Sequence, residues 1–429
     1  MALRNDCDTI VKEAIAQVRP DAAVARALAG RTFGPGRLIL VSVGNALEGN
    51  PFQGGRVVLV AVGKAAWSMA DAAWKSLEHK PDAGIVITKY DHSQGPIGTL
   101  EIHEAGHPVP DENTFSASAR ALELTEGLTG EDTVLFLLSG GGSALFEKTL
   151  IPGEELQDVT KQLLACGADI VEMNILRKRL SAVKGGRFAQ HCAPAKVFAV
   201  VLSDIIGDPL DMIASGPAYP DGSTCQQAQA IVEKYGLKLT PQAAALLAQE
   251  TPKSLDNVET QITGSVRELC RAAAEVCKDL GYEPVVLTDS LTCQAREAGS
   301  FLASIARYHQ DTNRSLAFLA GGETVVKLTG KGKGGRNQEI ALSAAEGIDG
   351  LKDTSVFSFG SDGTDGPTEA AGGFVTGGTK AQLSAKGLSI FDVLQDNDAY
   401  HALAACDGLI VTGATGTNVN DVAVVLIRR

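Results

Sequence analysis

Short apolar runs alternate with stretches of helical spacing along the first half of the chain. The run Val57–Val62 is apolar at every position, and Gly63 leads from it into a helical pattern over 64–77. An apolar run of this length predicts a strand that is buried on both faces. Further strands are predicted at 84–88, 133–138 and 197–202, and further helices at 5–29, at 114–126, after Gly142 and at 154–180. This alternation predicts a parallel sheet with helices on both faces.

The same alternation starts again after a polar stretch at about 240–263. Strands are predicted at 284–287, 316–320, 356–360, 408–412 and 422–427, with helices ending at about 308 and covering 337–346. A chain of 429 residues is long for one hydrophobic core. The sequence therefore predicts a larger parallel-sheet domain at 1–255 and a smaller C-terminal α/β domain at 256–429.

Composition and charge narrow the class of protein. The chain has 38 basic and 51 acidic residues, a net charge of -13, which is the wrong sign for a surface that binds nucleic acid. No apolar run approaches the roughly 20 residues of a membrane helix, and no charged-then-apolar leader opens the chain. Eight cysteines occur without a CxxC pair or zinc spacing. We expect a cytoplasmic protein with reduced thiols that binds neither nucleic acid nor membranes.

Glycine, serine and aspartate gather where predicted strands end. Five such clusters follow strands directly, at 63–64, 139–143, 203–208, 321–324 and 361–366. The carboxyl ends of parallel strands lie at one edge of a sheet, where ligands bind in open α/β folds. Glycine lets backbone N–H groups approach an anion closely. Any single cluster could be an ordinary tight turn, but five together favour a ligand site.

Charged residues in these clusters suggest what the ligand is. Asp204 and Asp208, and likewise Asp362 and Asp365, place carboxylates three or four residues apart, as Mg²⁺ sites do. The alternative is that these aspartates cap helices or close turns. Lys64 opens a predicted helix, where a cation is unfavourable unless an anion is bound nearby.

Two further stretches carry candidate chemistry. Arg336 ends a glycine-rich loop at 330–335, from which it could grip phosphate or carboxylate, unless the loop is a solvated hairpin tip. His107 stands between Gly106 and Pro108, in a stretch that reads as a rigid positioning loop rather than an acid–base site. The chain has no P-loop motif, and no strand leads directly into a G-x-G-x-x-G turn with an acidic residue about 20 positions on. The sequence therefore disfavours an ordinary nicotinamide site.

Ten segments spread over nearly the whole chain match one known family in order. They are Gly63–Ala66, Gly106–Glu112, Leu138–Ala144, Val183–Arg187, Leu202–Asp208, Ile213–Pro217, Gly321–Thr324, Gly334–Glu339, Gly363–Pro367 and Thr415–Asp421. On these segments the chain resembles the class II glycerate kinases, whose C-terminal domain is of the MOFRL type. The resemblance implies a Rossmann-like larger domain, a cleft between two lobes, and phosphorylation of D-glycerate by ATP and Mg²⁺. The 2-hydroxyl is the implied acceptor, which gives 2-phosphoglycerate.

The resemblance and the strand-end clusters together predict three groups of site residues. The predicted catalytic residues are Lys64, Asp204 and Arg336. The predicted substrate- or nucleotide-binding residues are Gly63, Ser139, Gly140, Gly141, Gly142, Ser143, Lys184, Glu323, Asn337, Thr417 and Asn418. The predicted metal ligands are Asp204, Asp208, Asp362 and Asp365. Whether Asp204 acts as a base or as a metal ligand stays open at this point.

Two other functions remain as alternatives. Relatives of this family have been labelled hydroxypyruvate reductases, which would use NAD(P)H, and two α/β lobes also suit a non-catalytic sensor of a small anion. One departure from the family pattern is Ala414, where proline is common, and it predicts a slightly looser turn. The sequence leaves the oligomeric state open between a monomer and a homodimer.

Overall fold

The computed structural model describes residues 2–34, 40–43, 46–49 and 54–429, and the chain forms two compact units. The parallel-sheet unit comprises Val24–Leu202 and Asp208–Thr263. The mixed-sheet unit comprises Met1–Ala23, Ser203–Gly207 and Gly264–Arg429. The sequence-based division into 1–255 and 256–429 keeps Met1–Ala23 and Ser203–Gly207 with the N-terminal domain, whereas contacts group them with the C-terminal segment.

The parallel-sheet unit contains the predicted parallel sheet. Its strands are β3 (Val57–Val62), β4 (Ala83–Lys89), β5 (Glu101–Ala105), β6 (Thr133–Leu138), β7 (Lys196–Leu202) and β8 (Val258–Gly264), in the spatial order β5-β4-β3-β6-β7-β8. The pairs from β5 to β7 are parallel. The amide N–H groups of Val197 and Ser203 donate to Asn257 and Gly264, so β8 runs the same way. The chain adds β4 and β5 on one side of β3 and β6 to β8 on the other, which is the Rossmann order with its switch point between β3 and β6.

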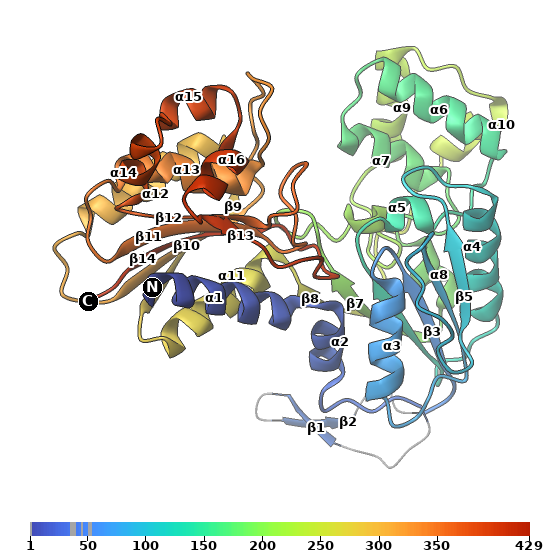
Figure 1. Cartoon of the computed structure of the whole chain (residues 1–429). Coiled ribbons are helices and arrows are strands. Elements are labelled where there is room, and N and C mark those ends of the chain that lie inside the picture. Colours follow the sequence, from blue (N-terminus) through green and yellow to red (C-terminus); the bar gives the residue numbers. More distant parts are fainter. Residues whose placement is uncertain (1, 35–39, 44–45, 50–53) are drawn as a thin grey trace. The chain divides into compact units, whose positions relative to one another are not determined.

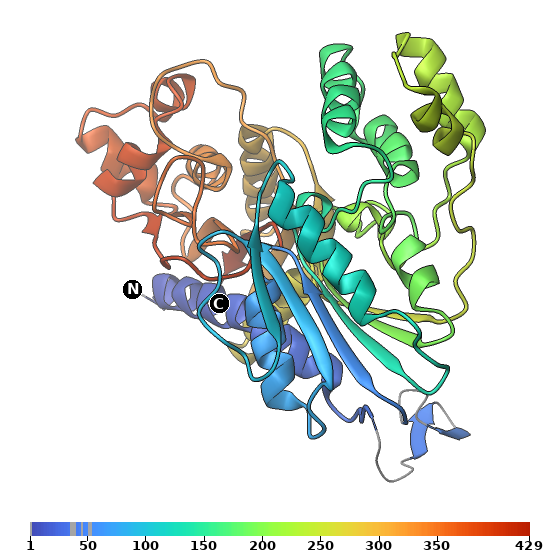
Figure 2. The same ribbon diagram turned by 90° about the vertical axis from the view of Figure 1, so that its right-hand side faces the viewer.

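Helices cover both faces of this sheet. They include α3 (Ala66–Ser76), α4 (Glu112–Leu124), α5 (Gly142–Leu145) and α8 (Arg187–Cys192), and the unit also holds a short hairpin of β1 (Leu40–Val43) and β2 (Ala46–Gly49). Figure 1 shows α3 on one face and α4 on the other, and Figure 2 shows the strands behind α4. This arrangement explains why β3 and β6 are buried at every position.

A group of helices after α5 has a hydrophobic core of its own. It consists of α6 (Gly153–Ala165), α7 (Ile170–Arg179), α9 (Cys225–Tyr235) and α10 (Pro241–Leu247), with the 3-10 helix η1 (Ile213–Ser215) beside α7 (Figure 2). Its core includes Leu163, Leu176 and Leu247. The predicted helix over 154–180 is interrupted at Gly167, whose φ of 74° ends α6.

The mixed-sheet unit does not repeat the fold of the parallel-sheet unit. Its strands are β9 (Glu283–Leu291), β10 (Leu316–Gly322), β11 (Thr354–Gly360), β12 (Gly372–Thr376), β13 (Leu409–Ile410) and β14 (Asp421–Ile427), in the order β13-β12-β11-β14-β10-β9. Only β9 and β10 pair in parallel, and the other pairs in this sheet are antiparallel. The C-terminal strand β14 inserts between β10 and β11 and is buried throughout.

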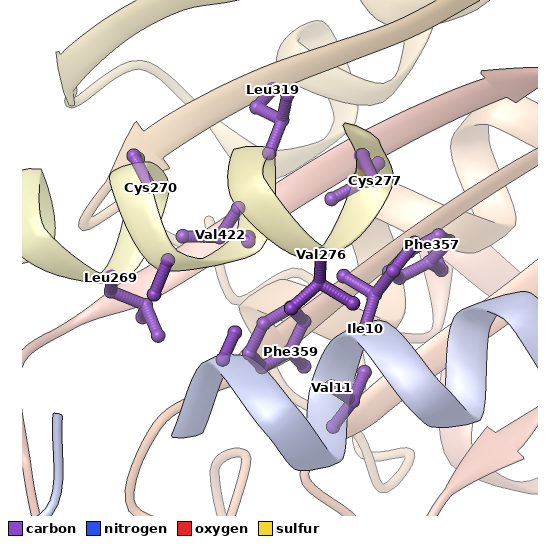
Figure 3. Packing of buried hydrophobic residues seen from close by; sticks show 14 of the residues in the cluster. Ile10, Val11, Leu269, Cys270, Val276, Cys277, Leu319, Phe357, Phe359 and Val422 are labelled. Carbon is purple, nitrogen blue, oxygen red and sulfur yellow. The ribbon is translucent and has the colours of Figure 1, made fainter. Parts of the chain in front are cut away.

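Two hydrophobic cores, one on each face, hold this sheet between helices. One face carries α12 (Ala295–Tyr308), α13 (Arg336–Gly347), α14 (Thr379–Ala385), α15 (Ile390–Gln395) and α16 (Ala399–Ala405) (Figure 1). The other carries α1 (Ala2–Val18) and α11 (Val266–Asp279). Figure 3 shows Ile10 and Val11 of α1 beside Val276 of α11 and Phe359 of β11. The first helix of the chain therefore completes the core of the C-terminal sheet.

The predicted helix over 5–29 is two helices, α1 and α2 (Pro20–Leu28). Pro20 lacks an N–H donor and so occupies the first turn of a new helix. None of the helices in the described parts of the chain is long and apolar enough to cross a membrane.

Candidate functional site

The loops after β3 and β6 meet at the switch point of the parallel sheet. The backbone N–H of Lys64 donates to the carbonyl of Gly140 at 2.9 Å, and that of Ala65 donates to Ser139 Oγ at 3.0 Å. A Cβ on Gly63 would lie 2.3 Å from Ser139 Oγ, and Gly63 has a φ of 119°. Only glycine therefore allows the two loops to approach this closely.

Positive charge gathers over these loops. Lys64 Cγ and the His107 ring both lie 3.1 Å from the point where a Cβ on Gly141 would stand. Burial and the nearby cations Lys64 and Lys89 lower the pKa of His107, which keeps its imidazole largely neutral at pH 7. Neither lysine makes an ion pair within the described parts of the chain. Asp111, which follows His107, instead caps α4 through the N–H of Thr114 at 2.9 Å.

A third cation at this edge was missed by the sequence analysis. Arg177, in the last turn of α7, donates from Nη2 to the carbonyl of Ser143 at 3.2 Å. One turn earlier on the same helix, Asn174 accepts a hydrogen bond from Ser215 Oγ at 3.1 Å, and that hydroxyl lies 3.2 Å from Ser143 Oγ. The cluster of basic residues at 177–179 was the sequence feature that could have pointed to Arg177. Cations are also favoured at a helix C-terminus by the helix dipole, so the cluster alone does not indicate a ligand.

Lys184, a predicted binding residue, lies inside the parallel-sheet unit. Its Nζ donates to Glu147 at 2.7 Å and to the carbonyl of Phe146 at 2.9 Å, and its side chain is fully buried. Burial lowers the pKa of Lys184 to about 8, against the opposing effect of Glu147. The ammonium group therefore fixes the chain after α5, and a ligand cannot reach it in this conformation.

Arg336, a predicted catalytic residue, is held by two carboxylates of the mixed-sheet unit. Its Nε and Nη2 donate to Asp421 at 2.5 and 3.2 Å, and its Nη1 donates to Glu323 at 3.0 Å. Burial raises the pKa of Asp421, and Arg336 opposes that rise. The arginine thus neutralises a buried carboxylate that the sequence analysis did not select.

Asp204 belongs to the same neighbourhood. Asn420 Nδ2 donates both to the carbonyl of Asp204 and to the carboxylate of Glu323, each at 3.2 Å. The structure thereby brings together three loops, which are the loop after β7, the loop after β10 and the loop before β14. Lys64 and Ser139–Ser143 belong to the parallel-sheet unit.

Asp365 binds the N-terminal end of α13, whose N-cap residue, Gly335, has no side chain to do so. Its carboxylate accepts from the N–H groups of Asn337 at 3.1 Å and Gln338 at 2.9 Å. Burial raises the pKa of Asp365 to about 7 despite these two hydrogen bonds. The side chain of Asn337, a predicted binding residue, is buried and accepts from Ser358 Oγ at 2.5 Å. Both side chains are therefore committed to the fold.

Asp362 and Asp421 flank a glycine at the end of β11. A Cβ on Gly360 would lie 3.4 Å from Asp362 Oδ1 and 3.3 Å from Asp421 Oδ1. Asp362 is half-buried, and its Oδ1 accepts from the N–H of Thr364 at 3.0 Å. In the parts of the chain with described placement, no group of three or more His, Cys, Asp or Glu side chains could hold a metal ion by itself.

The remaining predicted residues have mixed positions. Thr417 is buried, and its hydroxyl donates to the carbonyl of Val18 at 3.0 Å, which ties the loop before β14 to α1. Asn418 is exposed and accepts from the N–H of Asn420 at 3.4 Å. Asp208 has a φ of 51° and a buried Oδ1 without a hydrogen-bond partner in the described part of the chain.

Two family models match the chain. Residues 6–248 match a domain of unknown function, DUF4147, and residues 316–421 match the MOFRL family. A D-glycerate 2-kinase from Thermotoga maritima is 49% identical over 424 residues, with 97% of each chain covered. A crystal structure of glycerate kinase from the same organism superposes with a TM-score of 0.90 at 48% identity and covers 100% of both chains.

One relative carries the name of an enzyme of another class. A protein from Agrobacterium vitis with a hydroxypyruvate reductase name is 39% identical and covers 85% of this chain and 85% of its own. Some proteins similar to this chain are therefore named glycerate kinases, and others are named hydroxypyruvate reductases.

Proposed function

The chain belongs to the glycerate kinase family with a C-terminal MOFRL domain, and on this basis we propose that it is an ATP-dependent glycerate 2-kinase. In this reaction the γ-phosphoryl group of ATP is transferred to the 2-hydroxyl of D-glycerate, which releases ADP and 2-phosphoglycerate. The family relationship covers nearly the full length of the chain, as expected when both units are needed for activity.

The observation that carries the proposal within the structure is the cationic edge of the parallel sheet. In a protein with a net charge of -13, Lys64, Lys89 and Arg177 lie around the switch point of a Rossmann-order sheet, and none of the three has a carboxylate partner among the described residues. Phosphoryl transfer depends mainly on positioning and on neutralising charge that moves between oxygens. Both reactants, ATP and glycerate, are anions that such an edge can hold.

We assign the acidic groups of the mixed-sheet unit to metal and proton chemistry. Mg²⁺ in ATP-dependent enzymes is usually held by one or two carboxylates together with phosphate oxygens and water. Asp362 and Asp204 fit this donor set, because both are half-buried and lie at strand ends. Asp365 caps α13 instead. When bound, Mg²⁺ would neutralise charge on the phosphates, and Asp204 would hold or accept the proton of the acceptor hydroxyl.

The test is a direct assay of the reaction. The purified protein is incubated with ATP, MgCl₂ and D-glycerate, ADP is measured by a coupled assay, and the product is identified by ³¹P NMR. We expect stoichiometric ADP and 2-phosphoglycerate, and loss of turnover with EDTA. A 3-phosphoglycerate product would overturn the assignment of the hydroxyl, and absence of ADP release would overturn the kinase.

The same preparation also tests the reductase. NAD(P)H is followed at its absorbance band in the presence of hydroxypyruvate without Mg²⁺. We expect no oxidation of NAD(P)H, because no described strand leads directly into a glycine-rich dinucleotide turn. The run 330–335 has G-x-G-x-x-G spacing, but it follows β10 only after a loop of seven residues, 323–329. A glycine turn of that kind binds dinucleotides when it joins a strand to a helix directly.

A further inference from the structure

Three consecutive cations occupy the last turn of α7, and two of them have carboxylate partners. Lys178 Nζ lies 3.2 Å from Asp221, and Arg179 lies 3.2 Å from Glu250. These ion pairs fix α7 to Asp221, which precedes α9, and to Glu250, which follows α10. Arg177, the first of the three, makes no ion pair within the described parts of the chain.

Most hydrogen-bond donors of Arg177 are uncommitted. A guanidinium has five N–H groups, and the only hydrogen bond of this one within the described residues is the bond from Nη2 to Ser143. Its Nε is shielded from solvent and has no partner in the same part of the structure. A buried N–H group without an acceptor is costly, because it loses hydration without gaining a hydrogen bond. An oxyanion ligand would supply an acceptor for this N–H and a counter-charge for the guanidinium.

The orientation of Arg177 is set by its helix and by the loop it contacts. Asn174 and Arg177 are three residues apart and so lie on one face of α7, the face toward Ser143. Ser215 lies between Asn174 and Ser143 and has a φ of 62°, within a turn that begins at Ala214 with a φ of 51°. A buried turn held in the left-handed region by its surroundings keeps α7 and the loop at a fixed distance.

We propose that Arg177 is a further binding residue of the parallel-sheet unit, which grips a carboxylate or phosphate group of a reactant above the 139–143 loop, next to Lys64. The proposal rests on the proposed function only for the identity of the reactants. The planar guanidinium presents paired N–H groups to two oxygens at once, whereas the ammonium of Lys64 acts as a point charge. Arg177 therefore orients the anionic group, and Lys64 neutralises part of its charge.

The experiment compares Arg177→Gln and Arg177→Lys with Lys161→Gln, which removes the same charge from an exposed position on α6. Steady-state KM values are measured for D-glycerate and for ATP separately. We expect one KM to rise at least 10-fold in Arg177→Gln, a smaller rise in Arg177→Lys, and a change below twofold in the control. A rise confined to D-glycerate identifies a carboxylate at this position, and a rise confined to ATP identifies a phosphate.

Several outcomes would overturn the proposal. KM values within twofold of the unchanged protein, or a lower kcat with both KM values unchanged, would mean that Arg177 does not bind a reactant. The near-UV circular dichroism spectrum of each variant is recorded to show that α7 is still packed. If Arg177→Gln fails to fold, Arg177→Lys carries the test, because it keeps the charge and removes only the planar fork.

A binding measurement separates this proposal from the proposed function. Inorganic phosphate and D-glycerate are titrated separately into the full chain by calorimetry, without turnover. If the protein shows no kinase activity but binds either anion, and Arg177→Gln weakens that binding at least 10-fold, the binding role stands and the kinase assignment fails. If the kinase is active and anion binding is unchanged in the variant, the binding role fails alone.

Discussion

Lys64 is exposed, unpaired in the described structure, and fixed through its backbone to the loop after β6. These three properties separate function from stability at one residue. An exposed side chain can usually be replaced with a stability change of about 0.5 kcal/mol or less. If the proposed function holds, the charge of Lys64 stabilises phosphoryl oxygens in the transition state.

We predict that Lys64→Met lowers kcat/KM for D-glycerate phosphorylation by about 100-fold or more, with little change in melting temperature. The same substitution should raise the pKa of His107, because it removes one of the cations that lower it. The pKa of His107 should stay below its ordinary value, since burial is the larger cause. Activity assays and an NMR titration of the imidazole measure the two effects. An unchanged His107 titration would show that the Lys64 ammonium lies elsewhere.

Arg336 combines a predicted catalytic role with a structural one. The substitution Arg336→Ala would leave Asp421 buried without its counter-charge. Removing one partner of a buried pair is far more costly than removing both.

We predict that Arg336→Ala lowers the free energy of unfolding by about 3 kcal/mol, and that Asp421→Asn in the same chain restores at least half of the loss. Urea unfolding of the two single variants and the double variant measures the coupling. Additive effects in this cycle would show that the pair contributes no stability, and the catalytic role of Arg336 could then be tested by alanine substitution alone.

Helix α13 begins at a cap whose charge depends on pH. Asp365 accepts two backbone N–H groups, which favours its ionised form, but its burial is the larger effect and raises its pKa to about 7. The folded state therefore holds this proton more tightly than the unfolded state, in which a carboxyl group titrates near pH 4. The contribution of Asp365 to the free energy of unfolding is therefore largest below about pH 4, and it is lost as the pH rises toward 7.

We predict that the free energy of unfolding falls between pH 5 and pH 8 in the unchanged protein, and that this fall is at least 1 kcal/mol larger than the fall in Asp365→Asn. The slope is compared rather than the absolute stability, because asparagine also loses one of the two acceptor oxygens. Urea unfolding at several pH values provides the slopes. Equal slopes in both proteins would mean that Asp365 titrates at its ordinary pKa.

Two strands that the sequence analysis missed share one property. Strands β5 and β8 lie at the edges of the parallel sheet and are half-buried along most of their length, so their sequences EIHEA and VETQITG lack the apolar run of a central strand. The central strands β3 and β6 were predicted because burial on both faces demands apolar side chains throughout. The pattern of apolar residues therefore identifies strands that are deeply buried, and it misses strands that are half-buried at the edge of a sheet.

The sequence does not show which side chains meet when the partners are distant along the chain. The spacing within 203–208 or 361–366 is visible in the chain, but Arg336 meets Asp421 across 85 positions. Lys184 was selected from a glycine-flanked motif, and only the structure shows Glu147 beside it. Arg177 was overlooked for the opposite reason, since among the described residues it lacks the carboxylate partner that each of its two neighbours has.

The chain crosses between its two units at 23–24, 202–203, 207–208 and 263–264, so neither unit is a continuous segment. Helix α1 shows the consequence most clearly. Its residues Ile10, Val11, Ile15 and Val18 are at most 5% exposed and pack in the core of the mixed sheet, where Figure 3 shows Ile10 and Val11. At about 1.5 kcal/mol or more for each buried side chain, their burial contributes roughly 6 kcal/mol before the entropy cost of ordering the helix, which is large beside the net stability of a domain.

We predict that a fragment 256–429, cut at the boundary that the sequence suggests, does not fold cooperatively, because it exposes Val276, Phe357 and Phe359. A rearranged fragment should fold: residues 264–429, a linker of about eight Gly and Ser residues, then residues 2–23. Arg428 lies 2.9 Å from Asp6, so the two ends to be joined are close. Thermal unfolding and near-UV circular dichroism of both fragments measure the difference.

The control is Ile10→Asp in the rearranged fragment, which should abolish its cooperative unfolding, because a carboxylate replaces a fully buried apolar side chain. Cooperative unfolding of 256–429 alone would show instead that the sheet and α11 suffice and that α1 only covers them. The distinction bears on how the enzyme is assembled, since α1 is synthesised before its core partners in α11, β11 and β14. If α1 is required, it has no complete core to pack against until β14 has been synthesised.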